Sequence, residues 1–280
     1  GQSILVKLIN NRHNLGKTLN LNKVVFSNLA EREYLLSIDA DTIIPRDHTE
    51  LLLKLLKRDP KIAVAFGAVL PRRDRDTVIG RILERGRRFM YRLSFLTFRN
   101  AGNFLDFHYG LSGACVMYRV AALREVPRPY DSYAGDTSHA WELQRKGWKI
   151  HSEWRTYKIV YDPSTLRETL RQRIRWSSGP YQNLYLRGIQ TIKDCFRISK
   201  KRGIGALYTI IYYSLLSTKY NLTYLSLLPL SFAIPSLQSW AIKFYILDIL
   251  AWLLVSSLAT YYFNKYYEKR YGIKISLGEY

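Results

Sequence analysis

The sequence predicts an α/β fold, in which helices flank a mostly parallel sheet, followed by basic interfacial helices and an apolar C-terminal region. Three observations lead to this prediction. Short apolar runs alternate with helical patterns over residues 1–165. Residues 166–203 hold ten basic and two acidic side chains, a net charge of +8. Beyond them, two long stretches are almost free of charge.

The sheet is expected from four apolar runs that are each short enough for a strand. They span residues 4–9, 34–38, 62–66 and 114–118, and helical patterns such as 48–57 lie between them. Ligands of such sheets bind at the carboxyl ends of the strands. Functional side chains are therefore sought just after each run.

The composition is that of a folded, strongly basic chain of 280 residues. Hydrophobic residues make up 48%, which excludes a disordered protein. The two cysteines, Cys115 and Cys195, are too few for a disulfide scaffold or a cysteine-rich zinc module. The net charge of +21 indicates an anionic partner: nucleic acid, acidic lipid headgroups or a phosphorylated substrate.

The second half of the chain carries a membrane pattern. Apolar residues recur between the charges of 166–203, as in helices that lie on anionic membranes; a solvated basic helix is the alternative. Residues 220–242 hold no charge and 244–264 only Asp248, with Lys243 between them. Each stretch is long enough to span a bilayer, and a pair of buried core helices is the alternative.

Basic residues flank both apolar stretches, so the α/β part and the C-terminus are expected in the cytoplasm, with a short external turn near 235–242. We therefore expect a multi-pass protein of the cell membrane. Its expected parts are an α/β domain (1–165), basic interfacial helices (166–203), a transmembrane region of about two spans (204–264) and a cytoplasmic tail (265–280).

Two carboxylates, Asp39 and Asp41, directly follow the apolar run 34–38. Two acids so close to a buried strand repel each other unless they are solvated or share a cation. A divalent cation between them and a diphosphate would resolve the repulsion. An ordinary turn or a helix N-cap is the alternative.

Two glycine motifs are weaker signals. In Asn14-Leu-Gly-Lys17, the glycine permits close backbone approach and Lys17 offers a charge for phosphate, although a simple turn explains it equally well. Gly113 stands at the head of the run 114–118, where it either lines a pocket or simply starts a strand.

Asp136 stands where a helix is expected to begin. A helix N-cap is a good structural explanation. The functional explanation is a general base that takes a proton from an acceptor hydroxyl. His139 competes for that role, but a histidine in a first helical turn is more often at the surface or part of the packing.

Gln172, Arg175 and Trp176 share one face of an expected helix. A guanidinium suits a diphosphate and an indole suits the face of a sugar. A cationic interfacial helix with a tryptophan anchor is the alternative.

Taken together and in this order, the motifs resemble those of the processive family-2 glycosyltransferases with a GT-A fold, such as hyaluronan, chitin and cellulose synthases. The family motifs are N-x-G-K, D-x-D, an acidic E-D pair and Q-x-x-R-W. Their counterparts are Asn14-Leu-Gly-Lys17, Asp39-Ala-Asp41, Asp136 and Gln172-Arg-Ile-Arg175-Trp176. The resemblance covers about residues 4–180.

The resemblance implies a nucleotide-sugar donor, with a UDP-sugar as the first expectation. Asp39 and Asp41 would hold its diphosphate through Mg²⁺ or Mn²⁺. Gln172 and Arg175 would bind the pyrophosphate, and Lys17 would lie near the nucleotide.

On the acceptor side, the resemblance implies that Asp136 deprotonates the acceptor hydroxyl in a single inverting displacement. Trp176 would form the floor of the acceptor site and Gly113 would lie near it. The implied acceptor is a growing polysaccharide.

The chain departs from the family pattern in two ways. Gly135 stands where the family usually has glutamate. The N-terminal Y-N-E and D-D-G-S strands, which bind the nucleobase in the family, are not found here. We therefore expect a chain that lacks the N-terminal nucleobase-binding part.

Other functions stay open at this point. Transfer of a single sugar to a membrane lipid is the nearest alternative. A nucleic-acid-binding protein would account for the nine arginines and three acids of residues 72–99, but it has no use for the uncharged C-terminal stretches. A non-catalytic membrane protein is the third. We expect no nucleic acid partner.

Overall fold

The computed structural model describes residues 9–13, 15–27, 32–132, 134–211, 227 and 229–271. Its strands are β1 (Tyr34–Ile38), β2 (Thr42–Ile43), β3 (Ile62–Arg73), β4 (Cys115–Arg119) and β5 (Lys149–Asp162). The helices before β5 are α1 (Gly16–Phe26), α2 (His48–Arg58), α3 (Val78–Leu93), the π-helical η1 (Ser94–Arg99), α4 (Asn100–Leu105), α5 (Val120–Glu125) and α6 (Gly135–Arg145). Those after it are α7 (Leu166–Asn183), the π-helical η2 (Leu184–Gly188), α8 (Ile189–Ile198), α9 (Lys200–Ile211), the 3₁₀ turn η4 (Pro235–Leu237) and α11 (Gln238–Tyr271).

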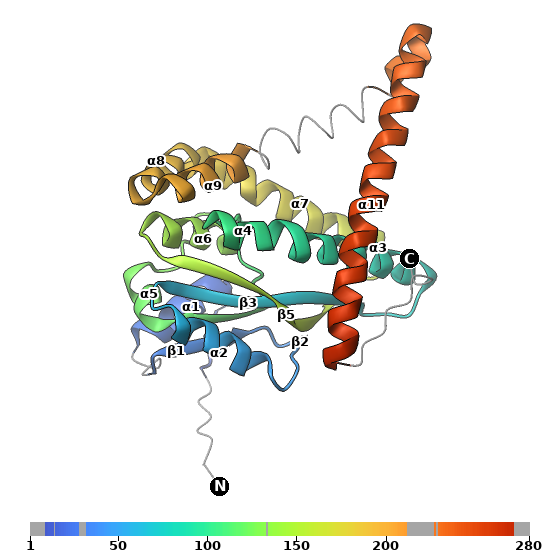
Figure 1. Cartoon of the computed structure of the whole chain (residues 1–280). Helices are drawn as coiled ribbons and strands as arrows, with labels where there is room; N and C mark the ends of the chain where they lie inside the picture. Colours follow the sequence, from blue (N-terminus) through green and yellow to red (C-terminus); the bar gives the residue numbers. More distant parts are fainter. Residues whose placement is uncertain are drawn as a thin grey trace.

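The elements form layers around one sheet (Figure 1). Helix α2 packs on one side of β3, and α4 and α6 contact β5. An outer layer follows, in which α7 and α8 contact α6 and α9 contacts α4. The expected α/β fold is confirmed.

The sheet is mixed, so the prediction of a mostly parallel sheet is wrong for the described residues. The strand order is β1-β4-β3-β5-β2. Only the β3–β5 pair is parallel, and the other three pairs are antiparallel. Strands β1, β3 and β5 do point the same way, but β4 lies reversed between β1 and β3. A strand buried on both faces is a continuous apolar run whichever way its neighbours point, so the sequence did not show the reversal.

Most of the expected elements are present. The runs at 34–38, 62–66 and 114–118 become β1, β3 and β4, and the pattern at 48–57 becomes α2. The run at 4–9 lies almost entirely outside the described residues. β5 was not predicted from the sequence, because polar residues at buried positions break its apolar pattern: Ser152, Glu153, Thr156 and Lys158.

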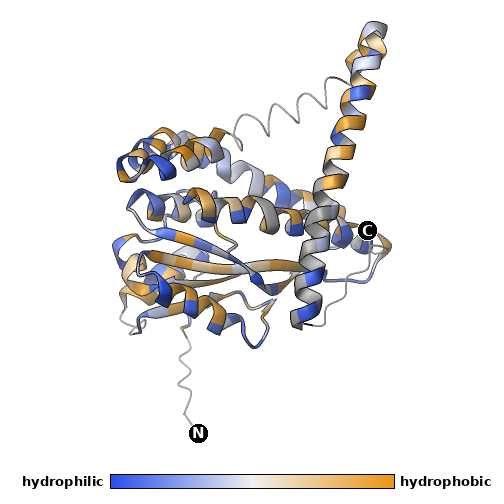
Figure 2. Ribbon diagram, in the orientation of Figure 1, coloured by the Kyte–Doolittle hydropathy of each residue, from blue (hydrophilic) through white to orange (hydrophobic). Residues whose placement is uncertain are grey.

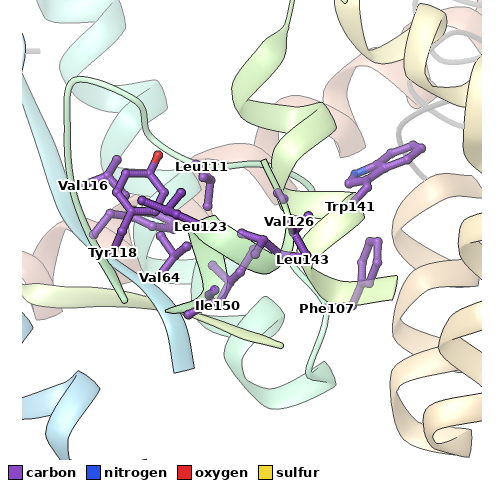
Figure 3. Close-up of a cluster of buried hydrophobic side chains, with 14 of the residues drawn as sticks. Val64, Phe107, Leu111, Val116, Tyr118, Leu123, Val126, Trp141, Leu143 and Ile150 are labelled. Carbon is purple, nitrogen blue, oxygen red and sulfur yellow. The ribbon is translucent and has the colours of Figure 1, made fainter. Parts of the chain in front are cut away.

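Two apolar clusters hold the sheet and helices together. The larger one joins β3 and β4 to α5 and α6 and includes Val64, Tyr118, Leu123 and Leu143 (Figure 3). On the other face, α2 contributes Leu52, Leu55 and Leu56, whose spacing forms one helical stripe. Because both faces are covered, residues 62–71 of β3 are all buried.

Three histidines are buried in this interior: His48, His108 and His139. Burial lowers the pKa of both His48 and His139 to about 4. Nδ1 of His48 lies 3.0 Å from Oγ1 of Thr156, and Nε2 of His139 lies 3.0 Å from the Val126 carbonyl oxygen. His139 is thus a packing residue in its neutral form, which was one of the two explanations expected for it.

We expect acid to destabilise the fold through these histidines. The unfolded histidine, with a pKa of 6.5, binds more protons than the folded one between pH 6.5 and 4. The free energy of unfolding therefore falls over this range, by on the order of 3 kcal/mol for each histidine. Denaturant titrations at pH 7.5 and 5 measure the change. His139→Gln should reduce the pH dependence and the same change at exposed His13 should not; equal pH dependence in both variants would contradict the prediction.

The C-terminal residues form one long helix. α11 follows the η4 turn and runs without a break through Lys243, the residue expected to separate two spans. Helix α11 contacts α3 and extends past the outer helices, with apolar and polar residues mixed along it (Figure 2). Within the described part of the chain, no helix has both the length and the apolar character needed to cross a membrane. The expected stretch 220–242 lies partly outside that part.

Candidate functional site

The site begins where β1 ends. The register pairs Ile38 of β1 with Cys115 of β4, so the residues after β1 lie beside those before β4. The Asp39 amide donates to the Ala114 carbonyl at 2.7 Å, and the Thr42 amide donates to the Asp39 carbonyl at 3.0 Å. The D-x-D motif therefore forms a turn between β1 and β2, as the ordinary-turn interpretation allowed.

Helix α1 brings Lys17 to this turn. Gly16, at its start, has a φ of 68°, which glycine adopts without strain. The Lys17 ammonium forms an ion pair with the Asp39 carboxylate and donates to the Gly113 carbonyl at 2.6 Å. Lys17 and Asp39 are both more than a third exposed, so their ion pair contributes little to stability. Asn14 lies outside the described residues.

Asp136 lies on the other side of Gly113. It belongs to the first turn of α6, whose N-cap is Ala134, so the N-cap interpretation of Asp136 is wrong. A Cβ atom at position 113 would lie 2.7 Å from Cγ of Asp136 and would overlap its Oδ2. Gly113 therefore separates the Lys17–Asp39 pair from the Asp136 carboxylate by the thickness of one backbone.

Arg128, which is 5% exposed, was not among the predicted site residues. Its Nη2 lies 2.5 Å from Oδ1 of Asp136 as an ion pair, in a geometry that leaves Oδ1 without a hydrogen bond. Asn22 of α1 holds the Arg128 backbone from both sides, accepting from its amide at 3.0 Å and donating to its carbonyl at 2.9 Å. The prolines at 127 and 129 mark a loop, but nothing in the sequence shows which carboxylate Arg128 faces.

Gly135 lies against the same arginine. A Cβ atom there would be 3.3 Å from Nε of Arg128 and 3.2 Å from Oγ1 of Thr18. Nε of Arg128 is buried and has no hydrogen-bond partner among the described residues. Any side chain at position 135 would therefore meet this guanidinium.

Asp162, the last residue of β5, connects Gln172 to the D-x-D turn, because it interacts with both Gln172 and Asp41. β2 pairs with β5 through Thr42 and Val160, which brings Asp41 towards the end of β5. Burial raises the pKa of Asp162; the charge of Asp41 adds to this, while Arg87, Arg173 and a hydrogen bond with Gln172 oppose it. Oε1 of Gln172 is buried without a partner in the described structure.

Helix α7 links the two halves of the site. Gln172 lies at the Asp162 end, and two turns later Gly179 packs so closely on Ala134 that a Cβ atom at 179 would overlap the alanine Cβ. Arg175 and Trp176 stand between them on the same helical face. Both side chains are exposed, and the Arg173 guanidinium lies 5.4 Å from the centre of the Trp176 ring. None of the contacts described joins Arg175 or Trp176 directly to Asp136.

The donor set fits a hard divalent cation only in part. Among the described residues, no group of three or more His, Cys, Asp and Glu side chains converges on one point. Asp39 and Asp41 offer two carboxylates on one turn, and carboxylate oxygen is the ligand that Mg²⁺ and Mn²⁺ prefer. A cation here would need its remaining ligands from water or from the oxygens of a bound diphosphate.

Comparison with known proteins places this arrangement in a family. The model of "Glycosyl transferase family group 2" matches residues 34–264, and the chain belongs to this family. The α/β fold with its mixed sheet is that of a GT-A-like glycosyltransferase.

Among individual relatives, the poly-β-1,6-N-acetyl-D-glucosamine synthase of Staphylococcus aureus (strain COL) is 24% identical over 208 residues, 74% of this chain and 47% of that protein. The corresponding synthase of Staphylococcus epidermidis is 25% identical over 189 residues, 67% of this chain and 44% of that protein. The chain thus spans about half the length of these curated relatives.

A solved structure shares the fold. It is the mannosyltransferase PcManGT from Pyrobaculum calidifontis in complex with GDP-Man and Mn²⁺, with a TM-score of 0.50 and 18% identity. The match covers 90% of this chain and 68% of that one.

Proposed function

We propose that the protein is an inverting glycosyltransferase that transfers a sugar from a nucleotide-sugar donor to a hydroxyl of a growing polysaccharide. The observation that carries the proposal is the placement of Lys17 with Asp39 on one side of Gly113 and Asp136 on the other. In this proposal Lys17 binds phosphate oxygens and Asp136 is the base, and the two side chains lie on opposite sides of one backbone segment. Family membership and the polysaccharide synthases among the relatives support it.

On the donor side, Asp39 and Asp41 would hold Mg²⁺ or Mn²⁺, which would neutralise charge on the leaving diphosphate. Lys17 binds a phosphate oxygen with the ammonium that otherwise contacts Asp39. Arg175 suits the diphosphate in a bidentate geometry, and Gln172 adds amide hydrogen bonds. All are proposals from side-chain chemistry and position.

On the acceptor side, Asp136 takes the proton of the acceptor hydroxyl while the oxygen of that hydroxyl attacks the anomeric carbon. The bond from that carbon to the diphosphate breaks in the same step, so the configuration inverts. Trp176 offers an apolar ring to the acceptor sugar, and Gly113 leaves space beside the carboxylate. The ion pair with Arg128 holds Asp136 in place.

A membrane location is part of the proposal. Apolar side chains are exposed along one face of α7, at Leu166, Leu170 and Ile174, opposite the face that bears Gln172 and Gly179. Val78 and Ile82 of α3 are exposed as well, and Arg87 of the same helix donates to Thr169 of α7. With the surrounding arginines, this surface suits acidic lipid headgroups of the cytoplasmic leaflet. Cosedimentation with anionic but not neutral vesicles is the test; equal binding to both would contradict it.

The nucleic-acid alternative has less support once the arginines of residues 72–99 are placed. Several form ion pairs within the chain: Arg73 with Asp76 and Glu84, Arg81 with Asp76, Arg87 with Asp162, and Arg88 with Glu84. They are therefore only partly available to a phosphate backbone.

A donor screen tests the proposed function. Membranes that hold the chain are incubated with UDP- and GDP-sugars, with and without chelator, and the products are sized. We expect transfer from one donor class, lost on chelation, and a ladder of products. Asp41→Asn should raise the metal concentration needed for half-maximal rate, whereas Asp47→Asn, outside the turn, should not. A single glycolipid would support the lipid alternative, and no transfer from any donor would contradict the enzyme.

A further inference from the structure

One lysine lies directly beneath the site and takes no part in the proposed chemistry. Lys158 is on β5, opposite Val69 of β3, and is 0% exposed. Burying an ammonium is costly unless it is well hydrogen-bonded. Among the described residues Lys158 forms no salt bridge. Its amine donates instead to two backbone carbonyls, Ser112 at 2.5 Å and Cys115 at 2.7 Å.

Those carbonyls flank the segment that divides the site. Between them stand Gly113, whose carbonyl accepts from Lys17 at 2.6 Å, and Ala114, whose carbonyl accepts from the Asp39 amide at 2.7 Å. All four consecutive carbonyls are thus held: the outer two by Lys158, and the inner two by Lys17 and the Asp39 amide. The Cα of Gly113 meanwhile faces the Asp136 carboxylate.

This arrangement leads to a role for the lysine. We infer that Lys158 is a positioning residue whose amine fixes residues 112–115 and thereby sets the distance between the Lys17–Asp39 pair and Asp136. The inference rests on the proposed function, because the distance matters only if both groups act on one donor–acceptor pair. A misplacement of about 1 Å at such a junction typically costs on the order of a hundredfold in rate.

The surroundings of the lysine give it a measurable signature. Burial lowers the pKa of Lys158 to about 7; Cys115 and Asp136 raise it, and Lys17 and Arg99 lower it. His48 also lies close enough for its own pKa to be lowered by this lysine. Lys158 gains its positive charge below about pH 7, and because this charge interacts with Asp136 and Lys17, we expect an inflection in the transfer rate near that pH.

The test compares Lys158→Met, which keeps the stem and removes the donors, with Lys149→Met on the same strand. Lys149 forms an ion pair with Asp59 and is partly exposed. In Lys158→Met we expect the Asp39 amide to exchange with deuterium at least about tenfold faster and kcat to fall at least about tenfold. The rate inflection near pH 7 should disappear. Lys149→Met should match the wild type in all three measurements.

Wild-type exchange at Asp39, or a wild-type kcat with its inflection intact, in folded Lys158→Met would overturn the inference. If Lys158→Met does not fold, Lys158→Gln retains a donor without a titratable charge. This variant should keep the Asp39 amide protected from hydrogen exchange and lose the rate inflection near pH 7. Loss of this protection together with a retained inflection would also overturn the inference. A wild-type chain that transfers no sugar contradicts the proposed function instead, while hydrogen exchange still decides the role of Lys158.

Discussion

Asp136→Asn is expected to lower kcat by about a thousandfold while leaving donor binding within about threefold of wild type. The amide has the size of the carboxylate but does not take up the acceptor proton. The donor-side groups, Lys17 and Asp39, lie beyond Gly113 and keep their contacts. Steady-state transfer and calorimetric binding of the donor nucleotide measure the two effects.

Asp131→Asn is the matched control for that change. Asp131 also forms an ion pair with a mostly buried arginine, Arg187, but lies in the loop before α6. Arg187 keeps its contacts with Glu142 and Asn183 after the change, so Asp131→Asn should lose no more stability than Asp136→Asn. Only Asp136→Asn should show the large fall in kcat. Transfer retained by Asp136→Asn would show that another group is the base.

Gly113→Ala is expected to reduce kcat by about a hundredfold with little change in stability. The added methyl group would overlap Oδ2 of Asp136, and the carboxylate must rotate away. Gly113 does not have a positive φ, so alanine fits its backbone without strain. The change should therefore appear in the rate. The free energy of unfolding, measured by thermal unfolding, should change by less than about 1 kcal/mol.

Gly86→Ala provides the comparison. Gly86 lies within α3, and a Cβ atom there would meet nothing within 4 Å. Alanine in this helix should stabilise the fold by about 0.5–1 kcal/mol and leave transfer unchanged. If Gly113→Ala transferred sugar at the rate of Gly86→Ala, the position of Asp136 next to Gly113 would have no catalytic importance.

Asp136 and Gly113, the residues changed in the two main predictions, had already been indicated by the sequence motifs. Asp39, Asp136 and Gln172 stand out because polar groups follow apolar runs or repeat on one helical face, and such patterns are local. Their assigned roles stay predictions, whereas the structure brings Lys17, Asp39, Gly113 and Asp136 together. The groups that hold them, Arg128 and Lys158, carried no local signal.

The sequence by itself determined that the chain is an α/β protein with a basic helical segment after it, because hydrophobic periodicity is encoded within each element. It also marked the residue types on which the site depends. Only the tertiary structure decided that β4 runs reversed between β1 and β3, which brings Gly113 to the end of β1. Strand direction and the partners of buried charges depend on contacts between distant segments, and a local pattern of apolar residues does not encode them.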